Sequence, residues 1–199
     1  MTLSPRARRL ALPLIAFLFG LAILGLAAIL TLTPSGRQAA VSSVGGPFTL
    51  VAHDGRTVTE KDFLGAPHLV FFGFTHCPDV CPTKLFEISE VLGATGDRGR
   101  SLRALFITVD PERDTPEVLK SYLGSFDERL VGLTGSPQAI EGVVKAYRAY
   151  ARKVPLKDGD YTMEHTSLVY LFDRRGHFVG SFNLNRPPAD AAKDLLARL

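Results

Sequence analysis

The chain contains only two cysteines, and they lie four residues apart, as Cys77 and Cys81 in the segment CPDVC. On a helix, side chains at positions i and i+4 share one face about 6 Å apart, so the two sulfur atoms can converge on one point. Two such thiols could form a structural disulfide, exchange disulfides catalytically, or bind a metal. A disulfide across so short a loop would constrain the unfolded chain very little, which disfavours the structural use. The spacing alone does not decide between redox chemistry and metal binding.

Histidine is the residue type that would complete a metal site with two cysteines, and the chain has five. Three of them are expected at ordinary surface positions beside turns or at a strand end, namely His53, His68 and His177. His76 adjoins Cys77, but adjacent residues on a strand or helix face in different directions, so we expect it outside the ligand set.

His165 is the candidate for the third ligand. It stands at the start of the predicted strand Ser167–Phe172, in the segment MEHTSLVYLF. In an α/β sheet, the loop that enters a strand next to the cysteine-bearing strand can lie over the N-terminus of the helix that follows the cysteines. Two thiolates and one imidazole form a soft donor set, which suits Cu(I) and also zinc with an open fourth position. Asp79 is the one acidic residue beside the cysteines, so a hard cation is not indicated.

The elements that must position these residues follow from hydrophobic periodicity and from turn and cap signals. The expected strands are Phe48–Ala52, Arg56–Val58, Leu69–Phe74, Leu102–Val109, Leu130–Leu133, Ser167–Phe172 and Phe178–Phe182. The expected helices carry Leu85, Ile88 and Leu92, follow the caps Thr115 and Ser136, and close the chain at Ala189–Leu199.

Strands that alternate with helices predict an α/β sheet, partly parallel, with an N-terminal β-hairpin and an antiparallel edge from the last hairpin. The cysteines fall where the strand Leu69–Phe74 meets its helix. This position is typical of a thioredoxin-like domain, in which the positive end of the helix dipole stabilises thiolates.

The segment DPERDTP follows the strand Leu102–Val109. We expect Asp114 and Thr115 to cap the next helix, with Pro116 at its first position. Asp110 and Arg113 are candidates for shaping the surroundings of a metal site, because groups just outside the ligands commonly orient them.

The N-terminal part predicts a membrane anchor. Leu10–Leu32 contains no charged residue, and as a helix it would be about 34 Å long, enough to cross a hydrocarbon core of about 30 Å. A cleaved signal peptide fits less well, because the run is longer than the usual hydrophobic region. Cleavage after Ala39 or Ala40 would also place Arg37 or Gln38 where a small residue is needed.

The expected organisation is a basic cytoplasmic segment at 1–9, a transmembrane anchor at 10–32, a flexible tether at 33–46 and a folded domain at 47–199. The arginines at 6, 8 and 9 account for the formal net charge of +3, and they orient the N-terminus into the cytoplasm. The first nine residues are too short for a mitochondrial transit peptide, so we expect the bacterial inner membrane with the domain in the periplasm. Because the charge of the folded part is balanced, no nucleic-acid partner is expected.

With these motifs the sequence resembles the Sco/SenC family of copper-binding cytochrome oxidase assembly proteins. The matching stretches are FFGFTHCPDVCPTK, FITVDPERDTPEVLKSY, LVGLTGS and EHTSLVYLFDRRG, in family order from about Pro47 to Phe182. An anchor ahead of the domain also matches the family's architecture. Lys84 departs from the family pattern, since many relatives carry an acid there, and this changes the charge of a docking surface without removing a ligand.

The resemblance implies a thioredoxin-like domain in which Cys77, Cys81 and His165 bind copper, as Cu(I) with Cu(II) as a second form. It implies delivery of copper to, or thiol reduction at, the binuclear copper site of cytochrome c oxidase subunit II. Another periplasmic copper chaperone or a thioredoxin-like reductant would be a further partner.

Two functions are therefore weighed. A membrane-tethered copper chaperone uses all three residues, whereas a thiol:disulfide oxidoreductase needs Cys77 and Cys81 as redox groups and does not need His165 as a ligand. The chaperone is the expected function, supported by thiol redox chemistry, and a turnover enzyme is not expected. A thiol peroxidase is a distant third, because the segment THCPDVCPTK contains no arginine to activate a cysteine.

Overall fold

The computed structural model describes residues 17–25, 44–157 and 159–199. The chain divides into two compact units, Met1–Val41 and Ser42–Leu199. In the first unit, residues 17–25 form a helix with exposed apolar side chains. No helix within the described ranges is both long enough and apolar enough to span a bilayer. Most of the predicted anchor at 10–32 and tether at 33–46, and all of the segment 1–9, lie outside the described residues.

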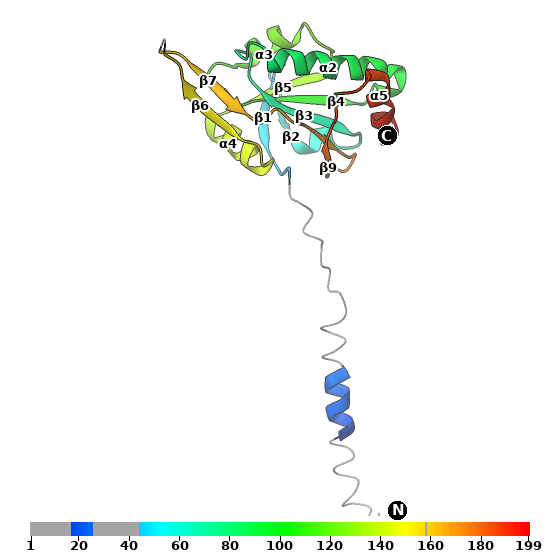
Figure 1. Cartoon of the computed structure of the whole chain (residues 1–199). Helices are drawn as coiled ribbons and strands as arrows, with labels where there is room; N and C mark the ends of the chain where they lie inside the picture. The colour runs from blue at the N-terminus through cyan, green and yellow to red at the C-terminus, as the bar shows by residue number, and fades with distance from the viewer. Residues whose placement is uncertain (1–16, 26–43, 158) are drawn as a thin grey trace, which may run out of the picture. The chain divides into compact units, whose positions relative to one another are not determined.

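A seven-stranded sheet organises the second unit (Figure 1). Its strands β3, β4 and β5 are parallel, and the strands on both sides of them are antiparallel. In spatial order the strands are β2 (Thr57–Thr59), β1 (Thr49–Ala52), β5 (Leu130–Thr134), β4 (Arg103–Thr108), β3 (His68–Gly73), β8 (Val169–Phe172) and β9 (Phe178–Ser181). The predicted partly parallel α/β sheet, its N-terminal hairpin and its antiparallel edge are confirmed.

The helices cover both faces of this sheet. Figure 1 shows α2 and α5 on one face and α4 on the other. The helices are α2 (Val80–Ala94), α3 (Pro116–Leu123), α4 (Pro137–Ala146) and α5 (Pro188–Leu196), with single turns η1 (Glu60–Phe63) and η2 (Gly96–Gly99). The predicted stripe Leu85, Ile88 and Leu92 of α2 is fully buried, because side chains at these spacings share the helix face that meets the sheet.

Strand β3 is buried along its whole length, as its continuous apolar sequence predicts for a strand covered on both faces. Its neighbour β4 pairs with it in parallel, with Phe71 opposite Phe106. The predicted caps are confirmed, since the side chains of Thr115 and Ser136 accept hydrogen bonds from backbone N–H groups three residues later. The connection to the cysteine-bearing helix α2 therefore leaves a strand that is fixed in the core.

One hairpin was not expected from the sequence. β6 (Ala151–Pro155) and β7 (Tyr161–His165) pair with each other in a separate two-stranded antiparallel sheet. Their side chains are mostly exposed or half-buried, so they lack the apolar alternation that predicts strands. The strand expected at Ser167–Phe172 begins only at Val169, as β8. His165 is therefore the last residue of β7 and does not lie at the start of β8.

Candidate metal centre

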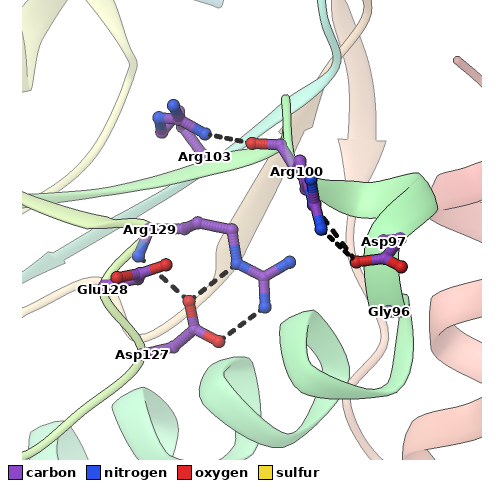
Figure 2. A pocket seen from close by; sticks show the side chains of 7 residues that line it. All are labelled: Gly96, Asp97, Arg100, Arg103, Asp127, Glu128 and Arg129. Carbon is purple, nitrogen blue, oxygen red and sulfur yellow. Dashed lines mark hydrogen bonds and ion pairs between the residues drawn. The ribbon is translucent and has the colours of Figure 1, made fainter.

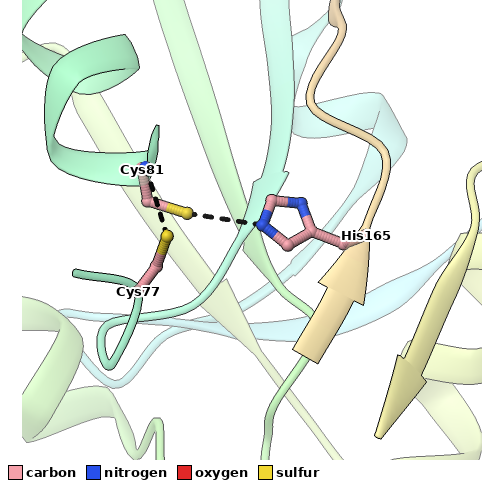
Figure 3. A group of neighbouring side chains, drawn as sticks. All are labelled: Cys77, Cys81 and His165. Carbon is pink, nitrogen blue, oxygen red and sulfur yellow. Dashed lines mark hydrogen bonds between the residues drawn. The ribbon is translucent and has the colours of Figure 1, made fainter. Parts of the chain in front are cut away.

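The cysteines lie in the connection from β3 to α2. After β3, the backbone N–H of Cys77 donates to the carbonyl of Phe74 at 3.3 Å, which closes a turn. The helix begins at Val80, and the backbone N–H of Cys81 donates to Sγ of Cys77 at 3.4 Å. Both cysteines are free thiols, Cys77 half-buried and Cys81 buried. Only Cys81 lies in the helix, whereas Cys77 lies in the turn before it, so the turn and the first turn of α2 together direct both sulfur atoms toward one point (Figure 3).

The two thiols differ in their surroundings. Cys81 has no exposed surface, and this burial raises the pKa of its thiol well above the ordinary value. A Cβ added to Gly73 would lie 2.8 Å from Sγ of Cys81, so the sulfur is packed directly against the backbone of β3. A buried thiolate at Cys81 therefore needs a cation beside it.

His165 approaches the cysteines from the end of β7. Its Nδ1 lies 3.0 Å from the carbonyl oxygen of Thr166. A carbonyl only accepts hydrogen bonds, so Nδ1 carries the proton and Nε2 keeps its lone pair. Burial lowers the pKa of His165, which keeps the ring neutral, and the ring packs edge-on against Phe71 and Phe74. These contacts aim a neutral nitrogen donor at the sulfur atoms.

The three residues meet as the sequence predicted. Nε2 of His165 lies 3.6 Å from Sγ of Cys81 (Figure 3), and all three candidate ligand atoms lie within 4.8 Å of one another. Metal–sulfur bonds of about 2.3 Å and metal–nitrogen bonds of about 2.0 Å place the ligand atoms of one ion about 4 Å apart. The group can therefore hold one soft metal ion with small side-chain adjustments.

A surface pocket of about 270 Å³ opens onto this group. Cys77 and His165 line it, whereas Cys81 lies beneath it. The remaining lining residues are Phe74, Pro78, Val80, Thr162, Met163 and Ser167. A metal ion held here would be reached from solvent along the side of Cys77 and His165.

The other histidines do not join the site. His76 and His177 are exposed, as expected, and His53 accepts a hydrogen bond from the backbone N–H of Gly132 at 2.9 Å. The expectation for His68 was wrong, because this residue is the first of β3, is buried, and stacks on Phe172 with ring centroids 5.2 Å apart. The strand therefore begins at His68, one residue before the apolar run that predicted a start at Leu69.

A larger hollow of about 590 Å³ lies beside η2 and the turn before β5 (Figure 2). Two of the three acids that line it are paired, Asp97 with Arg100 and Asp127 with Arg129, both at 2.6 Å. No histidine or cysteine lines it. The chemistry of the described part of the chain therefore lies at the three-residue group, not at this hollow.

Comparison with known proteins gives a consistent result. The model of the SCO1/SenC family matches residues 36–199. The mitochondrial SCO1 homolog of Mus musculus is 43% identical over 159 residues, which are 78% of this chain and 56% of the mouse protein. The chain spans about half the length of the mouse, Arabidopsis thaliana and human relatives that it matches.

Solved structures agree with this match. The copper-bound ScoI of Bradyrhizobium japonicum is 59% identical, with a TM-score of 0.77 over 78% of this chain and 99% of that one. BsSco, a member of the Sco family of cytochrome c oxidase assembly proteins in which a disulfide switch was identified, is 27% identical, with a TM-score of 0.60 over 75% of this chain and 90% of that one. These neighbours support the thioredoxin-like Sco fold that the motifs indicated.

Proposed function

The chain belongs to the SCO1/SenC family, and we propose that it is a membrane-anchored copper metallochaperone that delivers copper to the binuclear copper site of cytochrome c oxidase subunit II. The observation that carries this proposal is the convergence of Cys77, Cys81 and His165 within 4.8 Å. Two sulfur donors and one neutral imidazole match the preference of Cu(I) for soft ligands. Copper is the cargo of this function.

The geometry supports binding followed by transfer. Cys81 would hold the ion from below as a buried thiolate, whereas Cys77 and His165 face the pocket. Three protein ligands leave a coordination position open, and that position faces solvent. An acceptor thiol or imidazole could therefore enter from the pocket and replace Cys77 or His165 first, so that copper passes by ligand exchange.

We further propose that Leu10–Leu32 anchors the protein in the bacterial inner membrane, with residues 1–9 in the cytoplasm and the domain 47–199 in the periplasm. The support is the uncharged run and the arginines that precede it. The membrane, subunit II and a copper-donating periplasmic chaperone are then the partners. A tether at 33–46 would let the domain reach an acceptor in the same membrane.

The test is a Cu(I) titration of the reduced, full chain in detergent under anaerobic conditions, beside Cys77→Ser and His165→Ala. We expect one copper per chain in the wild type. Loss of an outer partner of a ligand already lowers affinity by about 10–100-fold. Because Cys77 and His165 would themselves be ligands, we expect a loss of more than about 100-fold in Cys77→Ser and of at least about 10–100-fold in His165→Ala. An unchanged affinity in His165→Ala would remove this residue from the site.

Thiol:disulfide exchange is the second candidate, because the two thiols are free and their sulfur atoms are neighbours. In this reaction Cys77 and Cys81 are oxidised to a disulfide while a partner disulfide is reduced to two thiols. Incubating the reduced protein with a disulfide-bonded peptide that carries the copper-binding cysteines of subunit II tests it. Reduction of the peptide without copper binding by the protein would favour this function over the chaperone.

A further inference from the structure

The segment Asp110–Asp114 contacts both halves of the metal centre. It connects β4 to α3 and was expected mainly to cap that helix. Thr115 alone provides the cap. The carboxylates of Asp110 and Asp114, which are 3% and 0% exposed, point elsewhere, and a buried carboxylate is costly unless it is fully hydrogen-bonded. Their partners therefore show what the segment stabilises.

Asp114 holds the cysteine side. One of its oxygens accepts from the hydroxyl of Thr75 at 2.6 Å, and the other accepts from the backbone N–H of Thr75 at 3.1 Å and from the hydroxyl of Thr108 at 2.6 Å. Thr75 lies two residues before Cys77, at the point where the chain leaves β3. Asp114 thus fixes the start of the turn that presents the first sulfur.

Asp110 and Arg113 hold the histidine side. The hydroxyl of Tyr161 donates to Asp110 at 2.8 Å, and Arg113 bonds both to Asp110 and to the backbone carbonyl of Tyr161. The guanidinium of Arg113 also lies 3.8 Å from the centre of the Tyr161 ring. Tyr161 opens β7 and His165 ends it, on the same face of the strand.

Besides the packing of Ala151 and Met163 against the core, these polar contacts hold the hairpin in position. β6 and β7 pair only with each other, not with a strand of the main sheet, so no ladder of backbone hydrogen bonds fixes their distance from α2. The contacts of Asp110 and Asp114 reach 51 and 39 residues along the chain. A helix cap needs no partners at such separations.

We propose that Asp110–Asp114 is a bracket that sets the distance between the cysteine side and the histidine side of the metal centre. Asp110, Arg113 and Asp114 are positioning residues, since none of them belongs to the group of candidate ligands. The inference rests on the proposed copper binding for its first readout. Its second readout, the thiol–disulfide equilibrium of the metal-free protein, is independent of that function.

The variants delete one hydroxyl from each end of the bracket without changing side-chain shape. Thr75→Val removes a partner of Asp114, and Tyr161→Phe removes a partner of Asp110. Thr75→Ser keeps the hydroxyl that Thr75→Val lacks, and it serves as the conservative comparison. Tyr150→Phe is the matched control on the hairpin, because its hydroxyl faces Glu164 and not the bracket. Thr95→Val is the matched control for a buried threonine hydroxyl at the far end of α2.

The experiment measures Cu(I) affinity by competition with a chelator, and the nitrogen coupling in the Cu(II) electron paramagnetic resonance spectrum, for each full-length variant. Thermal unfolding of the metal-free protein is recorded beside them. The loss of one hydrogen bond changes an equilibrium constant by about 3–10-fold. We therefore expect the copper Kd to increase by about this factor in Thr75→Val and in Tyr161→Phe. Nitrogen coupling should change in Tyr161→Phe and persist in Thr75→Val. Thr75→Ser and both controls should keep wild-type affinity.

The metal-free readout is the equilibrium of the cysteine pair with glutathione. We expect at least about a threefold shift in Thr75→Val and none in Thr95→Val. If the wild type binds no copper, the proposed function is wrong. The glutathione equilibrium of Thr75→Val then still tests whether Asp114 positions the cysteine side. Wild-type values for Thr75→Val and Tyr161→Phe would overturn the bracket. So would losses in Tyr150→Phe and Thr95→Val as large as theirs, because the effect would then be a general loss of stability.

Discussion

The two sides of the metal centre are built in different ways. The cysteine side is continuous with the core, because β3 is buried along its length and Cys81 has no exposed surface. The histidine side is an added hairpin whose strands are half-buried or exposed and pair only with each other. The site therefore joins a half that is part of the core to a half that is attached by polar side-chain contacts and by limited apolar packing.

This difference indicates which changes separate copper binding from folding. Changes on the cysteine side disturb packing in the core, so they should cost stability together with affinity. Changes on the histidine side remove contacts outside the main sheet, so they should cost affinity with a smaller loss of stability. The same arrangement leaves Cys77 and His165 at the pocket and Cys81 beneath it, which orders the candidate ligands by their access to a partner.

The largest expected effect tests this order within the cysteine side. In the reduced, metal-free protein, iodoacetamide should modify Cys77 at least about 100-fold faster than Cys81. The thiolate is the reactive form, and the raised pKa of the buried Cys81 leaves little of it at pH 8. Quenched time points analysed by peptide mass spectrometry give both rates. Similar rates for the two cysteines would show that Cys81 opens to solvent and would break the comparison.

A second prediction addresses the coupling of the cysteine side to the core. In Gly73→Ala the new Cβ would lie 2.6 Å from Cε2 of Phe106 and 2.8 Å from Sγ of Cys81. Overpacking of this kind costs about 1–3 kcal/mol in the free energy of unfolding. The displaced sulfur should lower copper affinity by about 10–100-fold, the range for a ligand that loses its support. Urea unfolding and Cu(I) competition measure the two effects.

The control for this variant is Gly93→Ala in α2, where nothing lies within 4 Å of the added Cβ. Alanine is favoured over glycine inside a helix by about 0.5–1 kcal/mol, so this variant should be as stable as the wild type or more so. Copper affinity should not change. A Gly73→Ala protein that loses neither stability nor affinity would contradict the tight packing of Cys81 against β3.

The smallest expected effect distinguishes the buried His68 from the half-buried His165. His68 lies at the start of β3, far along the strand from the cysteines, and burial lowers its pKa. An unfolded histidine has a pKa of about 6.5, so below that pH the unfolded chain takes up a proton that the folded chain does not. Stability is therefore fully present above about pH 6.5 and falls as the pH drops toward the folded pKa, at up to about 1.4 kcal/mol per pH unit.

The variant His68→Leu removes this titrating group without touching the metal centre. Urea unfolding of the metal-free protein between pH 7.5 and 5.5 should give a flatter stability profile for His68→Leu than for the wild type. Copper affinity at pH 7.5 should stay the same. An unchanged slope would mean that His68 is not kept neutral in the folded protein. His68 would then not differ from His165 in the way that its burial indicates.

Much of the fold could be predicted because the relevant signals are local. The apolar run of β3, the caps Thr115 and Ser136, and the buried stripe of α2 each follow from a few adjacent residues. The β6–β7 hairpin could not be predicted this way, since its half-buried and exposed strands carry no apolar alternation. His68 was misplaced for a related reason: a polar residue at a strand end is buried only because Phe63 and Phe172 pack around it.

The sequence by itself determined the chemistry: two cysteines four apart, a histidine ahead of a late strand, and the family motifs that connect them. Only the tertiary structure decided how the histidine reaches the cysteines. Residue types and spacing act over one or two turns of chain, whereas Cys81 and His165 are 84 residues apart in sequence. Their meeting depends on the hairpin and on the long-range contacts of Asp110 and Asp114, and such contacts exist only when the sheet, the helix and the hairpin have packed together.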